Sequence, residues 1–180
     1  TDGLTCQWPM LGVHNAQNAE TAIAMASTVG VERSAAFNEL SNFSGVGRRL
    51  DKLFQSEAVV VWDDFAHHPT AIEQTIQAIR EEAPDWLLHA VIELRSNTMR
   101  AGEHGTSLLR AVRGADFVTW VVMDSVGWDT TILEATKPPM KVVHDALLLV
   151  PELVDVGGQI VFMSNGDFSG IQKAVVKQLS

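Results

Sequence analysis

The stretch Glu57-Ala58-Val59-Val60-Val61-Trp62-Asp63 decides the fold class, because it is a short apolar run rich in β-branched residues. Such a run predicts a strand that is buried on both faces of a sheet. After a polar turn, Thr70-Ala71-Ile72-Glu73 matches a capping box that opens a helix, with Thr70 as the N-cap. Ile72, Ile76 and Ile79 then repeat at helical spacing. A buried strand followed by an amphipathic helix is the repeating unit of α/β proteins.

The same alternation continues to the end of the chain. Further strands are predicted at Trp86–Glu93, Asp116–Met123 and Gln159–Ser164. Further helices are predicted at Thr106–Val112, His144–Val154 and Ile171–Leu179. Strands that alternate with helices form parallel βαβ units. The sequence therefore predicts an α/β fold, a Rossmann-like open and mostly parallel sheet with flanking helices.

The first quarter of the chain has a different pattern. Two helices are predicted, at His14–Ala26 and at Ser34–Asn42, and Ser44-Gly45-Val46-Gly47 has the composition of a linker. We therefore divide the chain into a helical segment, residues 1–42, and a sheet domain, residues 43–180. The chain begins at Thr1 without an initiator methionine, and we expect it to be part of a longer protein.

Composition restricts the partners and the compartment. Thirteen Lys and Arg against 22 Asp and Glu give a formal charge of −9, which argues against nucleic acid or an anionic membrane as the main partner. A single cysteine, Cys6, excludes an internal disulfide and favours the cytoplasm. The sequence has no phosphate-binding loop of the Gly-x-Gly-x-x-Gly or Gly-x-x-x-x-Gly-Lys type. If the protein uses ATP, we expect that loop to precede Thr1.

Polar segments follow three of the predicted strands: Asp63–Thr70, Arg95–Met99 and Ser164–Asp167. In open α/β sheets, ligands bind beyond the carboxyl ends of the strands. These segments offer carboxylates, imidazoles, a guanidinium and amides, which suit a polar ligand that bears a carboxylate. The sequence therefore predicts a ligand site at this edge of the sheet.

Other interpretations of these segments remain open. Asp and Asn at strand ends often cap the next helix or form turns. Asp63, Asp64, His67 and His68 could instead hold Mn²⁺ or Zn²⁺ in a metal-dependent phosphoesterase, although neighbouring side chains on one short turn diverge. A third possibility is an α/β domain that binds a ligand without catalysing a reaction.

Five motifs, in order, resemble the Mur ligase family. Gly12–Ala19 resembles a segment near the end of the central ATPase domain of that family, and Phe43–Leu50 resembles the entry to its C-terminal domain. Asp63–Thr70 matches a motif shared by the branch that adds alanine to muramate and a branch that recycles cell-wall peptide. Glu93–Met99 separates the two branches and resembles the recycling branch, and Met163–Gly166 is similar to a later motif of that branch. Trp62 and Leu94 depart from the pattern, which has Tyr and Pro there.

The resemblance implies an ATP-dependent amide ligase that works through an acyl phosphate. The substrates would be UDP-N-acetylmuramate and the murein tripeptide L-Ala-γ-D-Glu-meso-diaminopimelate, or L-alanine if the chain belongs to the other branch. The cofactors would be ATP and Mg²⁺, with the main metal ligands and the catalytic residues upstream of this chain. Residues 1–42 would then be the helical end of the ATPase domain and residues 43–180 the C-terminal domain. The partners of this chain would include the N-terminal and central domains of the same protein. We expect the fragment alone to be inactive.

The resemblance also assigns roles to individual residues. The ATP-binding residues would be His14, Asn15, Asn18, Arg49 and Asp64. The residues that line the peptide pocket would be His67, Arg95, Ser96, Asn97, Thr98 and Asn165. Arg95 is the strongest candidate for a peptide carboxylate, and the alternative is a surface ion pair with Glu93 or Glu103. His68 could equally contact the ligand or support the loop.

Overall fold

The chain forms two compact units, Thr1–Gly47 and Arg48–Ser180. The structure is a computed structural model that describes residues 6, 8, 10–123, 125–134 and 137–180. The first unit is helical and contains α1 (Val13–Thr28), α2 (Arg33–Glu39) and the 3-10 turn η1 (Leu40–Asn42). α1 begins after Gly12, whose φ of 86° lies in the region that favours glycine. The two predicted helices are thus present in this unit.

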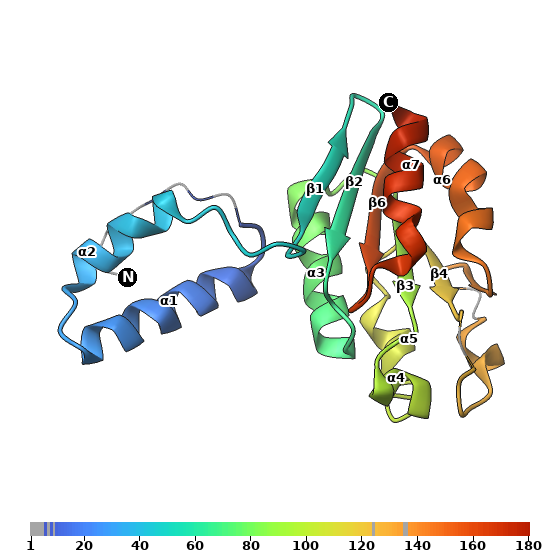
Figure 1. Ribbon diagram of the computed structural model, residues 1–180, viewed down its shortest axis with the longest axis horizontal. Coiled ribbons are helices and arrows are strands. Elements are labelled where there is room, and N and C mark those ends of the chain that lie inside the picture. The colour runs from blue at the N-terminus through green and yellow to red at the C-terminus, as the bar shows by residue number, and fades with distance from the viewer. Residues whose placement is uncertain (1–5, 7, 9, 124, 135–136) are drawn as a thin grey trace. The chain divides into compact units, whose positions relative to one another are not determined.

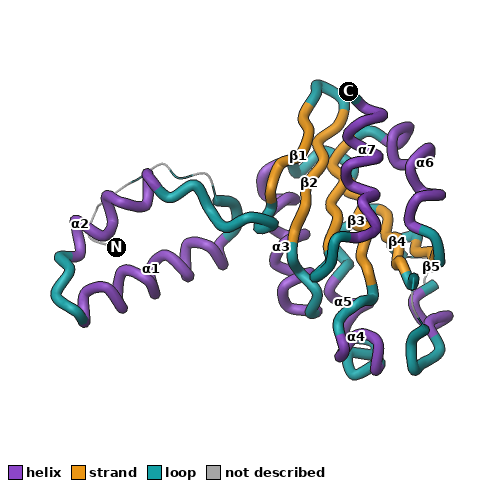
Figure 2. The backbone as a smooth tube through the Cα atoms, in the orientation of Figure 1, coloured by secondary structure: helices purple, strands orange, loops and turns teal. Residues whose placement is uncertain are grey.

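The second unit is built on a six-stranded sheet with the order β1-β2-β6-β3-β4-β5 (Figure 2). The strands are β1 (Asp51–Gln55), β2 (Val59–Asp64), β3 (Leu88–Glu93), β4 (Phe117–Val121), β5 (Met140–Val143) and β6 (Gly158–Met163). β1 is antiparallel to β2, and every other pair is parallel. The predicted open and mostly parallel α/β sheet is confirmed.

Helices cover both faces of this sheet (Figure 1). One face carries α6 (Val150–Val156) and α7 (Ile171–Leu179), and the other carries α3 (Pro69–Glu82) and α5 (Ser107–Ala111). The remaining elements are α4 (Asn97–Ala101) and the 3-10 turns η2 (Thr130–Leu133), η3 (Ala146–Leu149) and η4 (Phe168–Gly170). Within the described residues, none of the helices has the length and apolarity needed to cross a bilayer.

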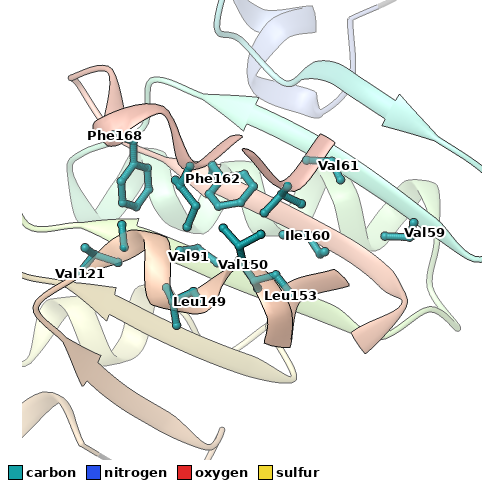
Figure 3. Packing of buried hydrophobic residues seen from close by; sticks show 13 residues of the cluster. Val59, Val61, Val91, Val121, Leu149, Val150, Leu153, Ile160, Phe162 and Phe168 are labelled. Carbon is teal, nitrogen blue, oxygen red and sulfur yellow. The ribbon is translucent and has the colours of Figure 1, made fainter. Parts of the chain in front are cut away.

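Alternate residues of the strands build the core under α6 and α7 (Figure 3). Val61 of β2, Val91 of β3 and Phe162 of β6 are fully buried there against Leu153 and Phe168. Because strand side chains alternate between faces, neighbouring residues on one strand point to opposite layers. This alternation decides where the polar residues at the strand ends lie.

Both edge strands were absent from the sequence prediction. β1 has the sequence Asp-Lys-Leu-Phe-Gln, with exposed and half-buried positions, and β5 has four half-buried residues. Edge strands are solvated along one side and lack the continuous apolar run of central strands.

The predicted cap of α3 is wrong. His68, with an extended backbone, is the N-cap, and its Nδ1 accepts a hydrogen bond from the Thr70 backbone N–H at 3.3 Å. Pro69 follows in the first turn of the helix. Proline suits that turn because it needs no N–H there and its φ is already helical. The loop-supporting role of His68 is therefore observed.

Candidate functional site

The three polar segments meet at the carboxyl edge of the sheet. They follow β2, β6 and β3, which are consecutive neighbours in the strand order. The segment after β6 therefore lies between the other two. In sequence it is about a hundred residues from the segment after β2 and about seventy from the segment after β3. The expected common edge is confirmed by this order.

Arg95 lies over Gly166 at this edge. A Cβ atom placed on Gly166 would be 2.5 Å from Arg95 Nε, so the guanidinium occupies the space that any side chain at 166 would need. Arg95 NH1 is 3.5 Å from Glu93 Oε1, and its side chain is 44% exposed. The expected alternative, an ion pair with Glu93, is thus present. The Arg95 side chain nevertheless remains partly accessible to solvent or ligand.

A buried polar chain holds Arg95 and its neighbours in place. The Ser164 hydroxyl donates to Glu93 Oε2 and accepts from the Gly166 backbone N–H at 2.8 Å. Glu93 is 3% exposed and Ser164 is fully buried. Charge-assisted hydrogen bonds of this kind are stronger than neutral ones. They fix the loop after β6 against the end of β3.

Asn165 lies in that loop, between Ser164 and Gly166. Its Oδ1 atom is buried, and among the described residues no group lies within hydrogen-bond distance of it. A buried amide oxygen is normally paired, because an unpaired one loses its hydration without compensation. This unpaired oxygen is therefore an exception to the usual pairing of buried polar atoms.

The segment after β3 forms the short helix α4. Ser96 is its N-cap, and its Oγ accepts from the Met99 backbone N–H at 3.4 Å. Asn97 is exposed, and Thr98 Oγ1 is 3.0 Å from Nε2 of His104. Ser96 is thus used mainly to begin the helix, whereas Asn97 is open to ligand.

The histidines of this edge have defined partners. His67 Nδ1 lies 2.8 Å from the Phe65 carbonyl oxygen, which can only accept, so Nδ1 carries the hydrogen of this bond. The rings of His68 and His104 meet edge to face, with centroids 4.6 Å apart. Burial, and then the neighbouring His68, lower the pKa of His104 from its ordinary value. His104 is therefore neutral at neutral pH.

Arg48 and Arg49 have different surroundings although they are adjacent in sequence. Arg48 Nε donates to Asp63 Oδ2 at 2.9 Å, and its NH2 donates to the Ser164 carbonyl at 2.7 Å. Arg48 therefore ties the ends of β2 and β6 together. Arg49 is exposed, with its guanidinium carbon 5.9 Å from the centre of the Phe65 ring. Of the two, Arg49 is the guanidinium available to an anion.

Asp64 is buried and hydrogen-bonded within the protein. Its carboxylate accepts from the backbone N–H groups of Leu50 and Ala66, each at 2.8 Å, and from the Thr75 hydroxyl at 3.1 Å. Burial raises the pKa of Asp64, and these bonds together with the Arg49 charge oppose that shift. Three donors already occupy this carboxylate, which has about four lone-pair positions. Little capacity remains for a ribose hydroxyl.

The other predicted ATP-binding residues lie in the first unit, on α1. Asn15 is buried, and its Nδ2 donates to the Leu11 carbonyl at 2.7 Å. Asn18 is exposed and His14 is half-buried. His14 and Asn18 are four residues apart and share one side of the helix. The side chains of His14 and Asn18 are thus presented from one helical face.

The arrangement does not support the phosphoesterase hypothesis. Asp63 and Asp64 point to opposite faces of the sheet, because Asp63 pairs with Arg48 and with Gln172 of α7, whereas Asp64 pairs with Thr75 of α3. Within the described ranges, no group of three His, Cys, Asp or Glu residues could hold a metal ion.

Sequence reasoning missed three contributors to this edge: the bridging role of Arg48, the close approach at Gly166 and the imidazole of His104. An Arg-Arg pair in a sequence does not predict which of the two side chains is buried. A glycine in a polar segment usually indicates a turn, and it does not predict that another side chain packs over it. His104 lies six residues beyond Thr98, and only the short α4 brings the two together.

Comparison with known proteins is consistent along the whole chain. The family description "Mur ligase, glutamate ligase domain" matches residues 48–152. The UDP-N-acetylmuramate–L-alanyl-γ-D-glutamyl-meso-2,6-diaminoheptandioate ligase of Escherichia coli (strain K12) is 36% identical over 179 residues, which is 97% of this chain. A UDP-N-acetylmuramate–L-alanine ligase of Arthrobacter sp. (strain FB24) is 33% identical over 150 residues, 83% of this chain and 30% of that protein.

A solved structure agrees with these sequence matches. The crystal structure of a murein peptide ligase from Psychrobacter arcticus 273-4 superposes with a TM-score of 0.73 and 34% identity, covering 96% of this chain and 38% of that one. The chain likewise spans 39% of the length of the Escherichia coli relative. The similarity therefore concerns a part of those longer proteins.

Proposed function

Since the chain belongs to the Mur ligase family, we propose that it is the C-terminal part of an ATP-dependent ligase that joins a murein tripeptide to UDP-N-acetylmuramate. The tripeptide is L-Ala-γ-D-Glu-meso-diaminopimelate, and the reaction serves the recycling of cell-wall peptide. The names of the Escherichia coli and Psychrobacter arcticus relatives support this assignment. The enzyme would work in the cytoplasm, which agrees with the single cysteine of the chain.

The observation that carries the proposal is the position of Arg95 over Gly166, in the loop that also contains Asn165. Arg95 presents a partly exposed guanidinium that is held by Glu93 and Gly166. A guanidinium binds a carboxylate through two parallel hydrogen bonds, which fix orientation as well as supplying energy. Arg95 would hold a carboxylate of the peptide, while His67 and Asn165 would line the pocket beside it.

In this reaction, ATP would phosphorylate the muramate carboxylate and the amine of the peptide would attack the acyl phosphate. The contribution of the present residues is to position the peptide, because correct placement of two reactants removes much of the barrier. Asn97 and Thr98 would line the same pocket, and Ser96 would hold α4 in place.

We assign the ATP contacts of the chain to two places. His14, Asn15 and Asn18 would approach the adenine, and Arg49 would reach the phosphates. Asp64 would act mainly by holding Leu50 and Ala66, with one lone pair left for the ribose. Residues 1–42 would form the end of the ATPase domain and residues 43–180 the substrate domain, with Ser44–Gly47 as a hinge. The main Mg²⁺ ligands and the catalytic residues would lie upstream of this chain.

The test is ADP release by the longer protein that contains this chain, with UDP-N-acetylmuramate, Mg²⁺ and ATP, and with either L-alanine or the tripeptide as acceptor. Turnover with the tripeptide alone is expected. Turnover with L-alanine alone would assign the protein to the branch represented by the Arthrobacter relative. Absence of turnover with either acceptor would favour a ligand-binding domain without catalysis.

A second experiment tests Arg95. Arg95→Ala is expected to raise the KM for the tripeptide about 10- to 100-fold, the loss typical of a hydrogen bond to a charged group, with a smaller effect on kcat. Arg113→Ala removes an exposed arginine elsewhere in the same unit and is the matched control. An unchanged KM in Arg95→Ala would refute the assigned role.

A further inference from the structure

The loop after β4 contacts the short helix α4 at the carboxyl edge of the sheet. β4 is the parallel neighbour of β3, so the segment that follows β4 lies beside the segment that follows β3. The Gly127 backbone N–H donates to the Arg100 carbonyl oxygen at 2.8 Å. The indole Nε1–H of Trp128 donates to the Met99 carbonyl oxygen, also at 2.8 Å. Two carbonyl groups in the last turn of α4 are therefore bound by this loop.

The indole ring of Trp128 also packs directly on the backbone of Gly102, the residue that ends α4. A Cβ atom placed on Gly102 would be 2.7 Å from Cγ and 2.8 Å from Cδ1 of the ring. The φ of Gly102 is 75°, in the left-handed region that favours glycine. Glycine therefore meets two requirements here, the turn that ends α4 and the close approach of the indole.

α4 depends on contacts of this kind. It has five residues, Asn97–Ala101, and a helix of that length is not stable without tertiary contacts. The bond at its N-cap, from the Met99 N–H to Ser96 Oγ, is 3.4 Å long and therefore weak. The bond from Trp128 has the length of a well-formed hydrogen bond. Trp128 therefore stabilises α4 more than this cap bond does.

The segment that carries Trp128 is itself anchored. Asp129 is the N-cap of η2, and its Oδ1 accepts from the backbone N–H of Thr131 at 3.0 Å and from the Thr131 hydroxyl at 2.7 Å. Leu133, the last residue of η2, is fully buried. Trp128 therefore reaches α4 from a part of the loop that is tied to the sheet unit.

We propose that Trp128 is a positioning residue for the peptide site and acts through α4. Arg95 directly precedes the N-cap of α4, and Asn97 and Thr98 lie in its first turn. Because the helix is little more than one turn long, a bond that fixes its last turn also fixes the orientation of Asn97 and Thr98. The inference rests on the ligase function proposed above, since the pocket concerned is the one that would receive the tripeptide.

The test uses the longer protein that contains this chain. It measures kcat, the KM values for tripeptide and ATP, and the amide hydrogen exchange of residues 97–102. Trp128→Phe keeps an aromatic ring and removes the N–H donor. It should raise the tripeptide KM about three- to tenfold, the effect of losing one neutral hydrogen bond, with kcat and the KM for ATP close to wild type. The amides of residues 97–102 should exchange faster by a similar factor.

The matched control for this variant is Trp86→Phe. Trp86 is also half-buried, but it precedes β3 and so lies beyond the opposite end of that strand from α4. Trp86→Phe should leave both the tripeptide KM and the exchange of residues 97–102 close to wild type.

A second pair of variants reaches the same contact from the helix. Gly102→Ala places a methyl group against the indole, whereas the described residues leave the space within 4 Å of a new Cβ on Gly105 open. Both glycines have positive φ, so the backbone cost of alanine is similar and the difference between the variants reports the indole contact. Gly102→Ala should raise the tripeptide KM, and Gly105→Ala should leave it close to wild type.

Two results would overturn the proposal. One is an unchanged tripeptide KM in Trp128→Phe. The other is a raised KM without faster exchange in α4, which would show that Trp128 contacts the peptide directly. Absence of turnover by the wild-type protein with either acceptor would instead refute the ligase function, and faster exchange in Trp128→Phe would then still show that Trp128 holds α4 in place.

Discussion

His89 makes the stability of the Arg48–Ser180 unit depend on pH. Its pKa falls from 6.5 to about 4 on folding, mainly because burial disfavours the charged ring. As the pH drops, the unfolded chain therefore takes up the proton before the folded protein does. The contribution of His89 to stability is complete above about pH 6.5 and is lost as the pH falls toward 4.

The size of the effect follows from that shift. Between pH 7.5 and pH 5, the linkage relation gives a loss of about 2 kcal/mol in the free energy of unfolding. The matched variant is the double substitution His89→Phe/Thr119→Val, because it removes both partners of the buried hydrogen bond and leaves no unpaired hydroxyl. Asp64, whose pKa is raised by burial, acts in the opposite direction but equally in both proteins.

The assay is urea unfolding at pH 7.5 and at pH 5, followed by tryptophan fluorescence, to which the buried Trp62 and Trp120 contribute. The wild-type chain should lose about 2 kcal/mol more than the double variant over this interval. Equal losses in the two proteins would refute the argument, since they would show that His89 is protonated in the folded state as easily as in the unfolded chain.

Two further predictions concern the carboxyl edge. Gly166→Ala should displace the Arg95 guanidinium, since the new Cβ would lie 2.5 Å from its Nε. The substitution should therefore raise the tripeptide KM of the longer protein several-fold. It should lower the free energy of unfolding by less than about 1 kcal/mol, because the exposed end of a flexible side chain can move. Gly127→Ala, with its nearest neighbour at 3.6 Å, is the control, and an unchanged KM in Gly166→Ala would count against the close packing. Asp64→Asn should lower the free energy of unfolding by about 2–3 kcal/mol, because the amide NH2 group faces donors where the carboxylate accepted hydrogen bonds. Urea unfolding checks this against the exposed Asp155→Asn, and equal stabilities of the two variants would contradict it.

The sequence by itself determined the central strands and the two long helices of the sheet unit. β2, β3, β4 and β6 are apolar runs rich in valine, isoleucine and aromatic residues, and such runs are stable only when both faces are covered. α3 and α7 carry helical apolar periodicity. The motifs at the strand ends also identified the family, because residue identities at fixed spacing are a property of sequence alone.

Only the tertiary structure decided how those motifs act together. The insertion of β6 between β2 and β3 places Gly166 against Arg95, and no local pattern specifies strand order. Alternation along β2 turned Asp63 and Asp64 to opposite faces, so two adjacent carboxylates have different partners. The contact between Trp128 and α4 likewise arises where the loop after β4 meets the segment after β3. Such features depend on contacts between residues far apart in the chain, whereas propensity and periodicity report only on neighbours.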